Sequence, residues 1–460
     1  MGGHRPGGRG GGVTSVVWLR RDARLDDNPA LTTAVEQGPV CVLFVIDPVL
    51  FDRVSPRRRN LLVAGLSDLD SRLAERGGRL RVERGDPAAV LPEVVARVGA
   101  EVVHVNREVT PYGRRRDNRV RAVSELVEHD GLYVHPPGFL LTRQGSPYRV
   151  FSAFYDKWRE RMSSPALFPD SPHLMTETGG GLPDPGRESI VAGETGAERR
   201  LDAFLDRIDR YAEERNRIDL AATSGMSVDL KFGWIGPRRL AAEIETRSPE
   251  AGAPFLRQLA WRDFYGHILA ANPHLVDRPL DERYLGLAWR NDPDDIAAWK
   301  GGQTGYPLVD AAMRQLVVEG WIHNRARMVA ASFLVKDLLV DWRIGERFFR
   351  HHLVDGDVAQ NSGNWQWVAG TGTDAAPYFR VFNPILQSQR FDPEGKYIRR
   401  WVPQLSEVPD SLIHAPWENG PLELLSYGVE LGKDYPHPIV DHDIVRRDAI
   451  AAYEAARGSR

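Results

Sequence analysis

The stretches G-W-I-H-N-R-A-R-M at 320–328 and D-G-D-V-A-Q-N-S-G-N-W-Q-W at 355–367 crowd indole rings and polar side chains into one short part of the chain. The segment D-W-R at 341–343 lies between them, and T-G-T-D-A-A-P-Y-F-R-V-F-N-P at 371–384 follows. Burying so many polar groups beside tryptophans costs free energy unless a large polar ligand is bound among them. The combination predicts a pocket for an aromatic cofactor.

Helical periodicity surrounds these stretches from residue 197 onward, which predicts an all-α C-terminal domain. The expected helices are 197–216, 237–245, 256–271, 308–319, 325–339 and 343–352.

The N-terminal part instead alternates apolar β-rich runs with helical segments, which predicts a Rossmann-like parallel sheet with helices on both faces. The expected strands are 16–19, 40–46, 80–82 and 102–105, and the expected helices are 28–36, 59–75 and 86–98. No G-x-G-x-x-G follows the first strand, so a standard dinucleotide fingerprint is absent. We therefore expect a disordered tail at 1–12, an α/β domain at 13–140, an interdomain linker at 141–196 and a helical domain at 197–460.

Composition limits the function without naming it. The 460 residues carry a net charge of −3, so any nucleic-acid-binding surface must be a local one. The single cysteine, Cys41, excludes an intramolecular disulfide framework, and a reducing cytoplasm is the simplest location. No apolar run reaches the roughly 18 residues of a membrane span. The absence of H-E-x-x-H and C-x-x-C spacing predicts no metal site, and without G-x-S-x-G hydrolase chemistry has no support.

Arg327, with Asp355 and Asp357, has two interpretations. An arginine near two carboxylates is ordinarily a structural ion pair. Here Asn361, Asn364 and Trp365 follow closely, and this mixture of donors, acceptors and an indole suits the polar edge of a flavin better. Removing Arg327 from a buried cluster would cost about 3–5 kcal/mol.

Three further groups of residues also have a plain and a functional interpretation. The turn Thr223–Ser227 either caps a helix or holds phosphate, with Tyr211 supplying another hydroxyl. Trp261 and Trp367 are either core residues or a stacking platform for an extruded base. The third group consists of arginines that are either solvated or phosphate contacts: Arg215, Arg262, Arg325 and Arg380.

Four motifs in this order resemble the photolyase/cryptochrome family, and most closely its class I cyclobutane pyrimidine dimer photolyases. They are W-R-D-F-Y at 261–265, T-G-Y-P-L-V-D-A-A-M-R-Q-L at 304–316, the run from G-W-I-H-N to V-D-W-R at 320–343, and D-G-D-V-A-Q-N-S-G-N-W-Q-W at 355–367. The resemblance extends from Val16 to about Arg457.

The resemblance implies FAD bound in the helical domain. Its ligands would be Tyr211, Thr223, Ser224, Gly225, Met226, Ser227, Gln258, Arg262, Trp321, Asn324, Arg327, Asp337, Asp355, Gly356, Asp357 and Asn361. Asn361 would face the flavin N5 and count, with the electron-relay chain Trp365, Trp342 and Trp289, among the catalytic residues. The residues facing damaged DNA would be Arg215, Gln258, Trp261, Arg262, Asn324, Arg325, Met328, Trp367 and Arg380.

The implied activity is light-driven repair, in which excited reduced FAD passes an electron to a flipped-out pyrimidine dimer, the cyclobutane ring opens and the electron returns. The implied partner is UV-damaged DNA, bound by a monomer that associates with the nucleoid. A cryptochrome-like photoreceptor and a (6-4) photolyase are the alternatives. Dimer-repairing members usually carry glutamate at the position of Gln258, and glutamine there is familiar in both (6-4) photolyases and animal-type cryptochromes. The G-W-I-H-N-R-A-R-M motif instead favours dimer repair.

The stretch V-N-R-E-V-T-P-Y-G-R-R-R-D at 105–117 resembles the subgroup with an 8-hydroxy-5-deazaflavin antenna. Arg21, Arg58, Glu108 and Lys231 match positions that contact this antenna. Methenyltetrahydrofolate is the alternative antenna.

Overall fold

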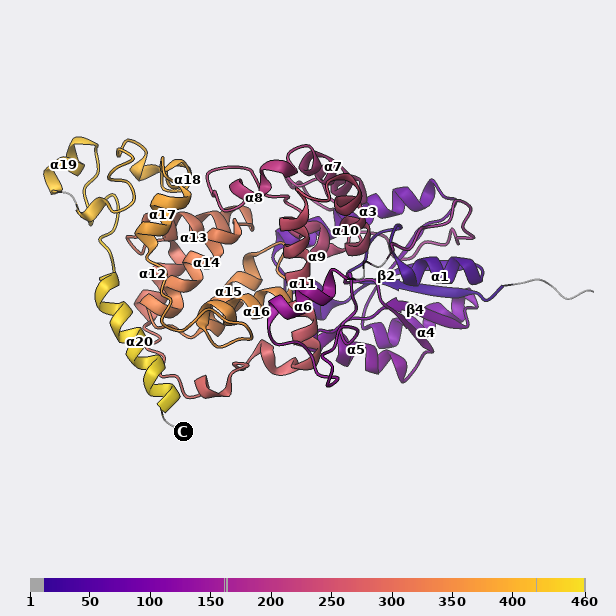
Figure 1. The fold of residues 1–460 in the computed structure, drawn as a ribbon. Coiled ribbons are helices and arrows are strands. Elements are labelled where there is room, and N and C mark those ends of the chain that lie inside the picture. Colours follow the sequence, from indigo (N-terminus) through magenta and orange to yellow (C-terminus); the bar gives the residue numbers. More distant parts are fainter. Residues whose placement is uncertain (1–11, 161, 163, 419, 459–460) are drawn as a thin grey trace, which may run out of the picture. The chain divides into compact units, whose positions relative to one another are not determined.

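The computed structural model describes residues 12–160, 162, 164–418 and 420–458 (Figure 1). The tail predicted at 1–12 therefore lies outside the described residues, apart from Gly12. The chain forms two compact units. Of the described residues, unit 1 contains 12–136, 162, 164–202 and 226–246, and unit 2 contains 137–160, 203–225, 247–418 and 420–458.

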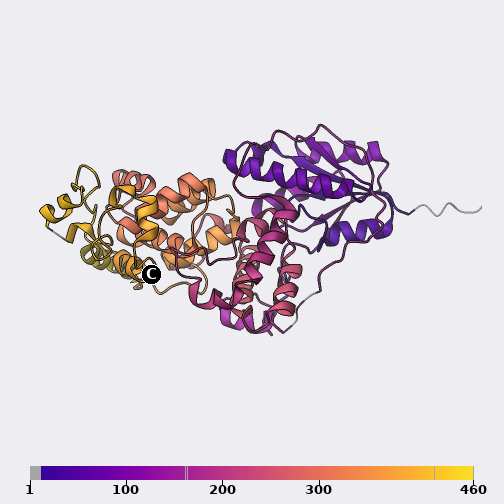
Figure 2. The same cartoon turned by 90° about the horizontal axis from the view of Figure 1, so that it is seen from above.

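Unit 1 is built on a five-stranded parallel sheet with the order β3-β2-β1-β4-β5. The strands are β1 (Ser15–Leu19), β2 (Val40–Ile46), β3 (Leu80–Arg84), β4 (Val102–Asn106) and β5 (Leu126–His129). Figure 2 shows helices on both sides of these strands. The strand order reverses between β1 and β4, and ligands of such sheets bind at the carboxyl ends of the strands at this point. The predicted α/β fold is confirmed, although β5 was not anticipated.

Five helices of unit 1 begin in the same way, with a capping side chain followed by proline, and α2 (Pro48–Phe51), a single turn, is one of them. The other four are longer: α1 (Pro29–Gln37), α3 (Pro56–Ala74), α4 (Pro87–Val98) and α5 (Pro111–Arg121). Leu91 and Val94 of α4 pack with strand residues, including Cys41, in one apolar core. Cys41 is only 1 % exposed, and burial raises the pKa of its thiol to about 11.

Residues 226–246 belong to unit 1, whereas the sequence assigned them to the helical domain. They form α9 (Ser227–Phe232) and most of α10 (Pro237–Arg247), and α7 (Gly193–Leu205) precedes them. Asp27 explains their place: its side chain accepts hydrogen bonds from the backbone N–H groups of Arg238 and Arg239 and pairs with the Arg238 guanidinium at 2.8 Å. This return of the chain adds Lys231 to unit 1.

The predicted linker at 141–196 contains a helix, α6 (Phe151–Trp158), that belongs to unit 2. Trp158 explains why it packs there: its indole N–H donates to Asp263 Oδ2 at 2.9 Å, and both side chains are buried. Part of the segment expected to be a linker is thus helical and packs within unit 2.

Unit 2 is helical, as predicted. Its α-helices besides α6 are α8 (Tyr211–Glu214), α11 (Ala253–Ala271), α12 (Pro293–Gly301), α13 (Pro307–Glu319), α14 (Asn324–Ser332), α15 (Trp342–His352), α16 (Val358–Ala369), α17 (Pro384–Phe391), α18 (Lys396–Trp401), α19 (Pro421–Ser426) and α20 (His442–Gly458). Short 3₁₀ segments lie at Ile208–Arg210, Pro273–Val276, Glu282–Tyr284, Pro403–Leu405 and Pro416–Glu418.

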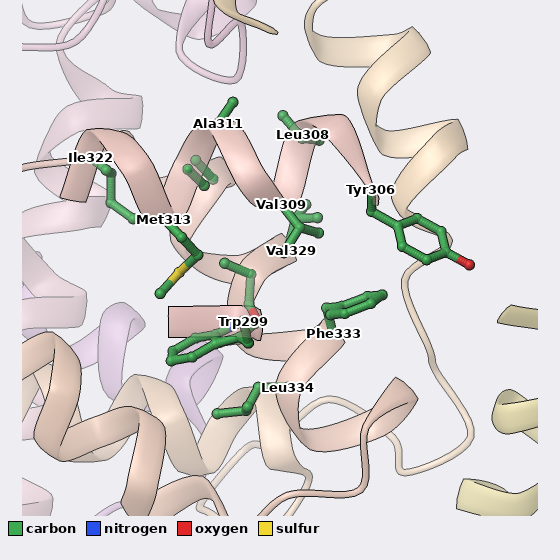
Figure 3. Close-up of a cluster of buried hydrophobic side chains, with 14 of the residues drawn as sticks. Trp299, Tyr306, Leu308, Val309, Ala311, Met313, Ile322, Val329, Phe333 and Leu334 are labelled. Carbon is green, nitrogen blue, oxygen red and sulfur yellow. The ribbon is translucent and has the colours of Figure 1, made fainter. Parts of the chain in front are cut away.

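Trp299 lies within the apolar core of unit 2, where Figure 3 shows it beside Met313, Phe333 and Leu334. Its indole N–H donates to the Ala330 carbonyl at 2.9 Å. The helix predicted at 325–339 is interrupted here, because α14 passes into a π-helical turn, η4 (Phe333–Asp337). Such turns are frequent at functional sites.

None of the helices in the described ranges is long and apolar enough to cross a membrane.

Candidate functional site

Helix α14 begins inside the first polar stretch because His323 caps it: its Nδ1 accepts a hydrogen bond from Arg325 N at 3.0 Å. Burial lowers the pKa of His323 to about 4, so the ring is neutral and can accept. This start places Asn324 and Met328 one turn apart, with Asn324 Nδ2 at 3.5 Å from Met328 Sδ. Neither side chain is buried, and Trp321, just before the cap, is also partly exposed.

Arg327 points from α14 to the loop between α15 and α16. Its Nη2 lies 2.8 Å from Asp355 Oδ2, and its Nε donates to the Ile322 carbonyl at 2.9 Å. The Asp355 side chain is 2 % exposed, and its Oδ1 has no hydrogen-bond partner among the described residues. The structure thus forms the predicted pair but leaves one buried acceptor without a protein donor.

Asp357 caps α16 by accepting from Gln360 N at 3.0 Å. One turn later, Asn361 Nδ2 donates to both the backbone carbonyl and the Oε1 of Glu346, each at 2.9 Å. Because both partners are acceptors, they fix the orientation of the amide and direct Asn361 Oδ1 away from α15. Burial raises the pKa of Glu346. No sequence pattern singled out Glu346, an ordinary acid in an arginine-rich helix.

Helix α11 carries Gln258, Trp261 and Arg262 on one face, since they are three and four residues apart. The Arg262 carbonyl accepts from Gln360 Nε2 at 2.8 Å, which ties this face to α16. The helices approach closely at Gly363, where an added Cβ would lie 2.3 Å from the Tyr265 ring. Only glycine allows this approach.

The tryptophans predicted as an electron relay differ in burial. Trp365 of α16 and Trp342 of α15 are 3 % and 2 % exposed, whereas Trp289 is partly exposed. Trp365 packs against α15 at Gly345, where a Cβ would lie 2.1 Å from the indole. The series therefore contains two buried rings and one that reaches the surface.

Tyr211 begins α8 and is buried, with its ring edge-on to Phe204 at 5.4 Å and to Phe255 at 5.8 Å. Burial raises the pKa of its hydroxyl. The predicted phosphate turn is divided between the compact units: Thr223, Ser224 and Gly225 lie in unit 2, while Met226 and Ser227 begin the part assigned to unit 1. Gly225 has a φ of 70°, the left-handed conformation that favours glycine.

Arg325 belongs to a local basic cluster. Its Nη2 donates to Asn216 Oδ1 at 2.8 Å, and its guanidinium lies 4.3 Å from the Phe391 ring centroid. Burial, with the charges of Arg390 and Arg215, lowers the pKa of Arg325. Cations so close together suit an anion. Sequence reasoning missed Arg390 in the last turn of α17, because no motif singled it out. Arg380 lies elsewhere, on an exposed loop.

Asp337 has a protein partner. Its Oδ1 lies 2.5 Å from His442 Nδ1 of α20, and burial raises its pKa to about 6 despite this contact. Nothing in the sequence linked these residues, which are 105 positions apart. As a cofactor ligand Asp337 stays a prediction.

Unit 1 has its own polar centre at the carboxyl ends of β1 and β4. Arg116 Nη2 lies 2.7 Å from Glu108 Oε1, and Arg20 Nη1 lies 2.8 Å from Asp117 Oδ1. Burial disfavours charge on Glu108, yet Arg116, Arg20 and Arg21 lower its pKa to about 2. The four antenna positions all fall in this unit: Glu108, Arg21, Arg58 on α3 and Lys231 on α9.

Two family models match the chain: "DNA photolyase" over residues 15–173 and "FAD binding domain of DNA photolyase" over residues 255–455. A protein of Halobacterium salinarum named deoxyribodipyrimidine photo-lyase is 39 % identical, with 96 % of this chain and 99 % of that protein covered. The chain belongs to the DNA photolyase family. Among solved structures, a class III photolyase from Agrobacterium tumefaciens is 37 % identical, with a TM-score of 0.91 over 99 % of this chain and 100 % of the other. A Synechocystis cryptochrome is 29 % identical, with a TM-score of 0.89 over 96 % and 100 %.

This photolyase-family chain therefore carries an FAD-binding domain, and its residues fit FAD. Asp355 Oδ1 is a buried acceptor for which the described residues supply no donor, and FAD supplies ring N–H and hydroxyl groups. Leaving such an acceptor without a partner costs about 1–3 kcal/mol. Among the described residues, no group of three or more His, Cys, Asp or Glu side chains could hold a metal ion.

Proposed function

We propose that this protein repairs cyclobutane pyrimidine dimers in DNA with light, as a deoxyribodipyrimidine photo-lyase. One observation carries the proposal: the relative of that name is 39 % identical over nearly the full chain. Two polar pairs support the proposal: Arg327 with Asp355, whose Oδ1 has no donor among the described residues, and Asn361 with Glu346.

FAD, when bound and reduced, supplies a photoexcitable electron donor. In this proposal Asp355 Oδ1 accepts from a cofactor N–H or hydroxyl, while Arg327 pairs with Oδ2 of the same carboxylate. Asn361 Oδ1, held by Glu346, serves as the acceptor that faces N5. The remaining ligands keep the predicted roles: Tyr211 and the 223–227 turn toward phosphate, with Gln258, Arg262, Trp321, Asn324, Asp337, Gly356 and Asp357 around the cofactor.

Lesion binding depends on flat, accessible rings and on local positive charge. Trp261 and Trp367, both partly exposed, would contact the flipped dimer, and Gln258, Asn324 and Met328 would line its pocket. A dimer stacks poorly in duplex DNA, so extruding it costs less than extruding an undamaged base. Arg215, Arg325 and Arg390 would hold the phosphates, with Arg262 and Arg380 as further contacts.

Trp365, Trp342 and Trp289 would carry electrons inward from the surface to photoexcited oxidised cofactor. Their burial supports this order, because the two inner rings are shielded from solvent and Trp289 reaches it. This relay would maintain the reduced state but take no part in repair itself.

The polar centre of unit 1 would hold the antenna. Its position at the reversal of strand order is the expected ligand crevice of such a sheet. Glu108 and Arg21, with Arg58 and Lys231, support 8-hydroxy-5-deazaflavin, and methenyltetrahydrofolate is the alternative. The class I subtype, the monomeric state and a cytoplasmic, nucleoid-associated location belong to the same proposal.

The similarity to a cryptochrome favours a second candidate, a photoreceptor without repair activity. One experiment separates the two. Protein reduced in advance is illuminated with blue light together with an oligonucleotide that carries one thymine dimer, and the remaining dimer is measured. We expect the dimer to disappear with turnover; FAD-loaded protein that leaves it intact would contradict the proposal. A (6-4) photoproduct tested in parallel shows whether Gln258 changes the lesion preference.

A further inference from the structure

Helix α6 touches the Trp261 wall of the proposed lesion pocket. Phe151, its first residue, stacks on Trp261 with ring centroids 3.7 Å apart and planes 9° from parallel. Phe264 and Tyr265 meet the same indole at 5.5 Å each. Phe151 is 1 % exposed, whereas Trp261 is partly exposed. Phe151 therefore covers one face of the indole, and the accessible part is what a ligand can reach.

Phe151 is itself held in place. The Arg257 guanidinium lies 4.9 Å from the ring centroids of both Phe151 and Tyr155. At the other end of α6, Trp158 is tied to Asp263 of α11 by its buried hydrogen bond. Two contacts to α11, one at each end of α6, hold Phe151 in place and leave the Trp261 indole little freedom to tilt.

The start of α6 also binds the loop that follows α16, the helix carrying Trp367. Thr373 Oγ1 donates to the Arg149 carbonyl at 2.6 Å, and Phe151 N donates to Asp374 Oδ2 at 3.2 Å. The loop returns to α16, since Ala376 N donates to the Trp367 carbonyl at 3.1 Å. One turn of α6 is thus connected to Trp261 on one side and to Trp367 on the other.

We propose that the start of α6 sets the spacing of the two tryptophan walls, with Phe151 as a positioning residue for Trp261. This inference rests on the proposed function. Phe151 touches neither DNA nor cofactor in this scheme. It keeps the indole in the orientation that a flipped dimer meets, so that binding does not have to order it.

The test replaces Phe151 by leucine, which keeps an apolar side chain but removes the flat face. We expect the affinity for a dimer-containing oligonucleotide to fall about tenfold, since aromatic pairs contribute beyond their buried area. Phe154→Leu is the matched control: Phe154 is equally buried on α6 and contacts Phe264 and His267. It should change this affinity by less than about twofold.

Two further readouts separate positioning from general damage. FAD content and the rate of flavin photoreduction should be the same in Phe151→Leu, Phe154→Leu and the parent protein. Equal loss of dimer affinity in both variants, or no loss in Phe151→Leu, would overturn the inference. A parent protein that fails to bind or repair the dimer would instead overturn the proposed function.

A second pair of variants covers the case in which Phe151→Leu does not fold. Thr373→Val removes the hydroxyl that donates to the Arg149 carbonyl and nearly keeps the volume. Thr371→Val is its control, because the Thr371 hydroxyl is buried without a hydrogen-bond partner among the described residues. We expect weaker dimer binding, about threefold, only in Thr373→Val; equal affinities in the two variants would refute the role of α6.

Discussion

Replacing Arg327 by glutamine should lower the free energy of unfolding, because it leaves the Asp355 carboxylate buried without its partner. Arg327 Nη2 lies 2.8 Å from Asp355 Oδ2, and the Asp355 side chain is 2 % exposed. Removing one partner of a fully buried pair costs about 3–5 kcal/mol, because the other charge remains buried and unpaired. The Arg327 side chain is 25 % exposed, so water can partly replace it, and we expect a loss of about 2–3 kcal/mol.

The assay is thermal unfolding of the FAD-loaded protein, followed by flavin fluorescence as the cofactor is released. A loss of this size should lower the melting midpoint of unit 2 by about 4–5 °C. The double variant Arg327→Gln, Asp355→Asn removes the orphaned charge as well and should recover at least half of the loss. Arg283→Gln is the control: Arg283 pairs with Asp281 but is 51 % exposed, and it should shift the midpoint by less than about 2 °C. A double variant no more stable than Arg327→Gln would refute the argument from an uncompensated charge.

Three other variants or conditions test separate parts of the molecule. Trp342→Phe should slow photoreduction of oxidised flavin, measured by transient absorption, at least about tenfold, and should nearly preserve dimer turnover by prereduced protein. Equal loss of both activities would show that Trp342 is not part of the relay. The pKa of Glu108 is about 2 in the folded protein against 4.5 when unperturbed, so its charge stabilises the fold above pH 4.5, and this stabilisation is lost as the pH falls toward 2. The melting midpoint of the parent should therefore fall relative to that of Glu108→Gln between about pH 5 and 3, and a difference between the two midpoints that stays constant over this range would contradict the ion network. The affinity for dimer-containing DNA should fall as the salt concentration rises despite the net charge of −3, and Arg325→Gln and Arg390→Gln should each reduce the slope of log K against log salt by about one. Binding that does not change with salt would exclude Arg325 and Arg390 as phosphate contacts.

The α/β unit could be predicted from the sequence wherever strands were buried on both faces. Runs such as Val40–Ile46 are apolar throughout, and the capping residue followed by proline marks the helix starts. β5 (Leu126–His129) was not predicted because it is short and only half buried, so its residues show neither a continuous apolar run nor a capping signal. Helix α6 was missed because it has eight residues and lies in a stretch that reads as a linker.

The site was harder to predict than the fold because its contacts join residues far apart in the chain. The motifs predicted that Arg327 and Asp355 lie together. No local sequence pattern indicates that Glu346 orients Asn361 or that His442 contacts Asp337. Helix α16 was not anticipated either. Its polar residues, among them Asn361 and Gln366, are buried as well, so the sequence lacks the apolar stripe by which helices are recognised.

The buried state of Cys41 has a practical consequence for following motion in this molecule. Its thiol is the only one in the sequence, lies in the sheet core and has a pKa raised to about 11, so maleimide dyes used at neutral pH should not react with it. A cysteine introduced on the exposed loop at Arg380 would then be the sole attachment point for a fluorophore, with no need to remove the native thiol first.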